Sequence, residues 1–360
     1  MPSTSQSELE NAMVAASVVP AVAHRRELPR NAALDFTKGT LVLLMVLYHW
    51  INYFIGPQWG YYNYFRFLTP SFIFISGFII SNIYLSKYQV SDPRLPMRLL
   101  SRGLKLLTIF VFLNASRLIA VQILGTGTSG RTQFAPWSLF AIFISGNLPD
   151  SGSKIVSFPI LVPISYLLAV SGVLMNPTRL FKYAFHVMCS LMLLVICGLD
   201  LLGRRSFNLE YIAIGIMGVL VGFVSMEKVK KVVKHPLAVT LFYVTYLIAI
   251  TRWGVPFPLL VIGVVLTLMI IYSVGERDVK VSSVRGAVDL LGKYSLLGYI
   301  GQIVILQVLS ASFHRLHLGR ASFAISFVAA FALTIASVEL TDYGRARVPG
   351  LDRLYKAVFA

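Results

Sequence analysis

The sequence predicts an all-α, polytopic integral membrane protein with about ten transmembrane helices. Of its 360 residues, 56% are hydrophobic and only 13% are charged, whereas soluble domains carry about 25% charged residues. The apolar residues are grouped in stretches long enough to cross a bilayer. The formal net charge of +17 comes from Lys and Arg that lie mostly between these stretches. Such residues orient helices and contact anionic lipids, so the charge does not indicate nucleic-acid binding.

The expected spans follow one another from residue 33 to residue 340, with the lengths that a bilayer requires. An additional apolar stretch, 134–146, is too short for a comfortable crossing, so we expect a re-entrant or interfacial segment there. The ten expected spans are 33–55, 66–86, 100–124, 158–175, 181–203, 209–226, 236–253, 257–275, 292–313 and 321–340.

The basic loops predict the topology of the chain. With ten spans, the loops 87–105, 228–234 and 277–285 share one side with both termini. The positive-inside rule places that side in the cytoplasm, and we expect a bacterial inner membrane. The chain then consists of a flexible cytoplasmic tail (1–30), one transmembrane domain (31–345) and a short cytoplasmic tail (346–360). Its two cysteines, Cys189 and Cys197, are too far apart on one helix for a disulfide, and no metal-binding cluster is expected.

Three ionisable residues in the first span are the leading candidates for chemistry: Asp35, Lys38 and His49. His49 is eleven positions after Lys38, so a helix places them about 16 Å apart on nearly the same face. Ionisable side chains inside a bilayer usually face the protein interior or a water-filled path. His49 is therefore a candidate general base, although a hydrogen-bonded histidine at the membrane interface is the simpler alternative. Asp35 and Lys38 have the spacing of an intrahelical ion pair.

The third span begins with a stripe of basic residues. Arg98, Arg102 and Lys105 recur at the helical spacing i, i+4, i+7. Such side chains suit the phosphates of a nucleotide or lipid, and an ordinary cytoplasmic anchor is the equal alternative. Deeper in this span, Asn114 and Arg117 are intramembrane candidates that line a path or tie helices together.

The first span resembles the transmembrane acyltransferase superfamily, which includes the acyltransferase-3 family and the catalytic domain of heparan-α-glucosaminide N-acetyltransferase. The string Asp35-Phe-Thr-Lys38-Gly39, followed by an apolar run and His49, is similar to the acyltransferase-3 pattern, in which Arg is more common than Lys at position 38. Three later strings also resemble that family in order and spacing: FLTPSFIFISGF (67–78), RLLSRGLK (98–105) and LGKYSLLGY (291–299). Gln302 is a second departure, since relatives often have His at that late position.

This resemblance implies an acyltransferase, and we expect an O-acetyltransferase. The donor would be acetyl-CoA or another acyl-CoA, and the acceptor a sugar or glycoconjugate, with membrane lipids around the protein and no metal or nucleic acid involved. Lys38 and the stripe Arg98, Arg102 and Lys105 would hold the CoA phosphates. His49 would act as the base or carry the acyl group, and Asp35 would hold Lys38 or a neighbouring helix.

Two other functions fit the same sequence. The first is a transporter or flippase for an anionic lipid or sugar conjugate, whose path Asn114, Arg117 and His49 could line. Inverted repeats and interrupted helices would favour it, and the sequence shows neither. The second is a membrane scaffold without chemistry, in which the basic loops bind lipid.

Overall fold

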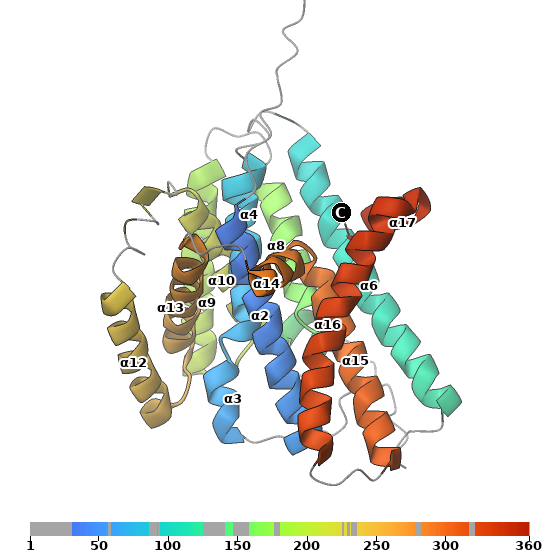
Figure 1. The fold of residues 1–360 in the computed structure, drawn as a ribbon. Coiled ribbons are helices and arrows are strands. Elements are labelled where there is room, and N and C mark those ends of the chain that lie inside the picture. The colour runs from blue at the N-terminus through green and yellow to red at the C-terminus, as the bar shows by residue number, and fades with distance from the viewer. Residues whose placement is uncertain are drawn as a thin grey trace, which may run out of the picture. The chain divides into compact units, whose positions relative to one another are not determined.

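A computed structural model describes residues 31–56, 59–85, 92, 94–124, 141–146, 158–175, 181–224, 227–228, 231, 236–277, 282–316 and 321–359. Every regular element in these residues is a helix (Figure 1). The expected N-terminal tail 1–30 and most of the stretch 134–146 lie outside the described residues. Within that stretch, Ala141–Ser145 forms one π-helical turn, η3.

The helices have the following bounds, in chain order: α2 (Ala32–Trp50), η1 (Ile51–Ile55), α3 (Trp59–Phe65), α4 (Leu68–Ile79), η2 (Ile80–Tyr84), α6 (Arg94–Leu124), η3, α8 (Leu161–Leu174), α9 (Phe181–Leu201), α10 (Phe207–Gly222), α12 (Pro236–Trp253), α13 (Phe257–Glu276), α14 (Ser283–Lys293), α15 (Ser295–Leu316), α16 (Ala321–Arg347) and α17 (Pro349–Phe359).

Seven helical segments in the described residues are long and apolar enough to cross a membrane. They coincide with seven of the expected spans, and the remaining three (158–175, 209–226 and 236–253) correspond to shorter apolar helices, α8, α10 and α12. The expectation of an all-helical protein with several membrane-crossing helices is therefore confirmed by helix length and composition. The seven segments are Ala32–Ile55, Gly60–Tyr84, Arg94–Arg117, Tyr183–Leu201, Phe257–Glu276, Ser295–Phe313 and Phe323–Arg347.

Two helices near the C-terminus differ from the elements expected there. The expected span 292–313 begins one turn too early, because the chain breaks at Tyr294 between the short helix α14 and the long helix α15. The segment 346–360, expected as a short tail, contains the helix α17, which turns away from the end of α16 (Figure 1). Both short helices border the site described below.

Glycines allow helices far apart in the sequence to pack backbone against backbone. Helix α2 lies against α14, where a Cβ on Gly39 would come 2.0 Å from the carbonyl oxygen of Val288. Helix α4 lies against α10 in the same way, and a Cβ on Gly77 would come 1.9 Å from the carbonyl oxygen of Gly215. Small residues at close crossings are typical of membrane helices. Gly39 and Gly77 belong to two of the family-like strings, so the structure explains both as packing positions.

Helices α2 and α4 each continue into one π-helical turn. In such a turn the backbone N–H bonds to the carbonyl five residues back, as Gly56 does to Ile51 at 3.1 Å. The turn η1 follows α2 directly after His49 and Trp50, and η2 follows α4 and ends at Tyr84. Single π-turns occur frequently at functional sites.

Candidate functional site

A cavity of about 270 Å³ lies among helices α2, α4, α6, α8, α14, α15 and α17. Three cations from distant parts of the sequence line it: Lys38, Arg102 and Lys293. We call it the cationic cavity. Its wall also contains six aromatic side chains besides aliphatic ones, namely Phe72, Tyr84, Tyr294, Tyr299, Tyr355 and Phe359. Two of its cations, Lys38 and Arg102, are residues that the sequence pattern selected.

Lys38 reaches the cavity from the beginning of α2. The side chain of Asn31 caps that helix by accepting a hydrogen bond from the N–H of Leu34 at 3.1 Å. Asp35 lies in the first turn, where the helix dipole favours a negative charge. The Lys38 Nζ lies 2.7 Å from the Asp35 carboxylate, and their side chains are only 17% and 10% exposed. The ion pair expected from the spacing is present, and it holds the ammonium at the cavity wall.

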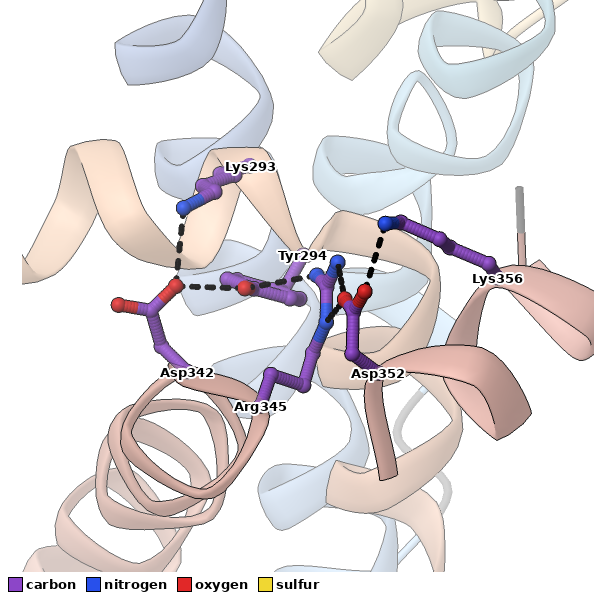
Figure 2. A network of polar contacts seen from close by, with 6 residues as sticks. All are labelled: Lys293, Tyr294, Asp342, Arg345, Asp352 and Lys356. Carbon is purple, nitrogen blue, oxygen red and sulfur yellow. Dashed lines mark hydrogen bonds and ion pairs between the residues drawn. The ribbon is translucent and has the colours of Figure 1, made fainter. Parts of the chain in front are cut away.

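Lys293 belongs to a polar network at the junction of α14, α15, α16 and α17 (Figure 2). Its Nζ donates to the Asp342 carboxylate at 2.8 Å, and the Tyr294 hydroxyl donates to the same oxygen at 2.5 Å. Arg345 donates to the Tyr294 oxygen at 2.8 Å. Burial, followed by the hydrogen bond to Asp342, raises the pKa of Tyr294 to about 12. The phenol is therefore neutral at physiological pH and serves as a donor that fixes Asp342 beside Lys293.

Arg102 differs from the two lysines because no carboxylate pairs with it among the described residues. Its guanidinium lies 5.5 Å from the centre of the Tyr84 ring, a cation–π arrangement that orients the group but leaves its charge uncompensated. The neighbouring helix α8 packs closely on α6 at Gly103, where a Cβ would come 2.7 Å from the carbonyl oxygen of Ser165. Arg102 is thus the cation most available to an incoming anion.

The other members of the expected basic stripe do not line the cavity. Arg98 is exposed and Lys105 is partly buried. Asn114 donates to the Phe110 carbonyl of its own helix at 2.9 Å, and Arg117 is partly buried. Neither Asn114 nor Arg117 lines the cationic cavity.

His49 lies in the last turn of α2 and does not line the cationic cavity. It is partly buried, and its ring centre is 5.0 Å from that of Tyr48. Tyr48 in turn contacts the rings of Tyr62 and Phe65, at 6.1 and 5.9 Å. His49 therefore belongs to a group of aromatic side chains outside the cavity.

A second cavity, of about 660 Å³, is lined by residues around the beginning of α10, including Arg204, Arg205 and Asn208. The Ser81 hydroxyl, just before Tyr84, donates to the Val219 carbonyl at 2.7 Å, so the end of α10 lies near the cationic cavity. Because α10 rises about 1.5 Å per residue over its 16 residues, its beginning lies at the opposite end. The two cavities thus open near opposite ends of the same helix.

The sequence reasoning did not select Lys293, Tyr294, Tyr355 or Phe359 as site residues. The first two lie in the family-like string 291–299, and the last two lie on one face of α17. The described residues contain no group of His, Cys, Asp or Glu that could hold a metal ion. Comparisons of the chain with protein-family models, with curated proteins and with solved structures find no match.

Proposed function

We propose that this protein is a membrane-embedded acyltransferase. It moves an acyl group, preferably acetyl, from cytoplasmic acyl-CoA to a hydroxyl or amine of a sugar or glycoconjugate. In this proposal the seven long and three shorter apolar helices form ten spans, with both termini in the cytoplasm of a bacterial cell. The cationic cavity is then the donor site at the cytoplasmic end.

The observation that carries the proposal is the uncompensated charge of Arg102 inside a cavity that it shares with Lys38 and Lys293. A guanidinium forms two parallel hydrogen bonds to phosphate oxygens, and these bonds are stronger than neutral ones. The two lysines keep their carboxylates, so they add donors without a large excess of buried charge. This arrangement suits a ligand with more than one phosphate, as CoA has.

The chemistry is assigned to His49. An extended thioester arm that starts at the phosphates has to follow α2 over about 16 Å to reach the imidazole. The imidazole removes the proton of the acceptor hydroxyl, and the oxygen attacks the thioester carbonyl. The C–S bond then breaks, and the departing CoA thiolate takes the proton from the imidazolium. The second cavity, near the opposite end of α10, offers room and polar side chains for the acceptor.

Turnover of acetyl-CoA by the purified protein in lipid nanodiscs tests this proposal, with release of free thiol as the readout. Arg102→Gln should raise the KM for acetyl-CoA at least about tenfold, since a hydrogen bond to a charged group is worth about 1.5–3 kcal/mol. Arg98→Gln is the matched control, because Arg98 lies one turn earlier and does not line the cavity. It should leave KM unchanged.

His49→Ala should abolish transfer while the variant still binds acetyl-CoA. The proposal is wrong if the native protein releases no thiol with any sugar acceptor. It is also wrong in its donor site if Arg102→Gln and Arg98→Gln have the same KM, and wrong in its base if His49→Ala keeps full activity.

A further inference from the structure

The C-terminal helix α17 brings two aromatic rings to the cationic cavity. Tyr355 and Phe359 are four residues apart, so they lie on one face of the helix, and both line the cavity. Their ring centres are 5.1 Å apart and their planes are inclined by 26°, which makes them a stacked pair. Helix α17 contacts α6, the helix that carries Arg102. The pair therefore stands at the edge of the cavity that the phosphate-binding cations line.

The polar network drawn in Figure 2 joins α17, the helix that carries this pair, to the end of α16. The Arg345 guanidinium donates to Asp352 at 2.6 Å and lies 4.0 Å from the centre of the Tyr355 ring. Lys356 also pairs with Asp352 at 2.6 Å, and the Tyr294 ring contacts Tyr355 edge to face at 5.3 Å. Helix α17 is thus attached to the end of α16 by charged and aromatic contacts. A ligand therefore meets rings that are already positioned.

The outer ring of the pair, that of Phe359, lines the cavity. Phe359 is partly buried, and its one ring contact among the described residues is with Tyr355. The Arg345 guanidinium lies over the Tyr355 ring, so we place a further planar group of the stack on the Phe359 side. The cavity volume of about 270 Å³ is close to the lower limit of small-molecule sites, about 300 Å³. The cavity therefore encloses only part of a large ligand, and the remainder lies along its edge.

We propose that the Tyr355–Phe359 pair stacks on the nucleobase of the acyl donor, a proposal that rests on the function proposed above. In a nucleotide the base is attached at short range to its phosphates, and this cavity places aromatic rings beside Arg102, Lys38 and Lys293. Aromatic side chains bind bases of any identity through their π-faces. The C-terminal helix thereby makes the protein specific for a donor with a nucleotide, because a donor without one gains nothing from the pair.

The test compares two acyl donors that differ only in the nucleotide: acetyl-CoA and S-acetyl-pantetheine. Phe359→Ala should lower kcat/KM for acetyl-CoA by roughly 5- to 150-fold, as expected from the loss of one base–aromatic stack, and leave kcat/KM for S-acetyl-pantetheine unchanged. Adenosine 3′,5′-bisphosphate should inhibit the native protein in competition with acetyl-CoA, and Phe359→Ala should weaken that inhibition by a similar factor.

Three further variants keep the test decisive. Phe359→Trp retains an aromatic face and should restore discrimination, whereas Phe359→Leu fills similar space without one and should behave like Phe359→Ala. Leu354→Ala is the matched control on the same helix, because Leu354 is 61% exposed and does not line the cavity. Equal losses with both donors, or the same losses in Leu354→Ala, would show that α17 has only a structural role. Absence of turnover by the native protein would instead overturn the proposed function.

Discussion

The contact between α2 and α14 leads to a quantitative prediction for Gly292→Ala. A Cβ at this position would lie 1.7 Å from the carbonyl oxygen of Asp35 and 2.5 Å from its carbonyl carbon. Ordinary van der Waals contact begins at 3.4 Å, twice the first distance. Both of these Asp35 atoms belong to the backbone of α2, so no side chain can rotate away. The two helices have to separate by more than an ångström.

Overpacking of this kind costs about 1–3 kcal/mol of folding free energy, and occasionally more. Replacing a helical glycine by alanine recovers only about 0.5–1 kcal/mol through backbone entropy and helix propensity. Gly286→Ala provides the control, because Gly286 lies in the same helix and a Cβ there has no neighbour within 4 Å. Gly292→Ala should therefore be destabilising, while Gly286→Ala should be neutral or stabilising by up to about 1 kcal/mol.

Thermal unfolding of the purified variants in the same detergent, followed by tryptophan fluorescence, measures this difference. Donor affinity provides a second readout, since Lys293 follows Gly292 directly and moves with α14. We expect a weaker affinity for acetyl-CoA in Gly292→Ala alone. If both alanine variants unfold at the same temperature, the close backbone contact between α2 and α14 is refuted.

The remaining predictions concern single polar contacts. Ser81→Ala removes the buried hydrogen bond to the Val219 carbonyl and should cost about 1 kcal/mol in the same unfolding assay, whereas Thr108→Ala, on the exposed side of α6, should cost less. Hydrogen bonds from Lys356 and Arg345 lower the pKa of Asp352 below its usual value. The ionised Asp352 carboxylate therefore stabilises the folded position of α17 fully above about pH 4, and this stabilisation is lost as pH falls through the lowered folded-state pKa. Hydrogen exchange should show weaker protection of the α17 amides at pH 3 than at pH 7, and Asp352→Asn should remove this pH dependence. Equal protection of α17 at pH 3 and pH 7 in the native protein would contradict this role of Asp352. Lys38→Arg should keep the KM for acetyl-CoA, and Lys38→Ala should raise it; equal KM values would exclude Lys38 from the proposed donor site.

The features that the sequence predicted well are those set by local spacing. Helix class follows from the length and composition of the apolar stretches, and the ion pair of Asp35 and Lys38 follows from three residues of separation on one helix. The helical period also brings Arg98, Arg102 and Lys105 onto one stripe. The spacing alone does not predict which of these three residues faces the cavity, because that depends on where α8 and α17 cover α6.

The features that the sequence reasoning missed arise from tertiary packing. The expected span 292–313 includes the last two residues of α14 as well as α15, since a long hydropathy window does not register the break at Tyr294. Lys293, which lies at this break, was not selected from the sequence. The sequence of α17 contains a weak indication of a helix. Its apolar residues Leu351, Leu354, Tyr355 and Val358 recur at i, i+3, i+4 and i+7, the pattern of an amphipathic helix. Its partners Arg345 and Tyr294 lie outside α17, and the spacing of residues within α17 does not predict such contacts.

The π-turn η2 sets the direction in which Tyr84 faces Arg102. A π-turn contains one residue more than the α-helical turn that it replaces. The turn takes up this residue, so Tyr84 keeps nearly the direction that it would have at the end of a regular helix one residue shorter. If the same residues formed a regular α-helix, Tyr84 would lie about 100° further around the axis and no longer beneath the guanidinium. The cation–π contact therefore depends on the π-helical form of this segment as well as on the identity of its two partners.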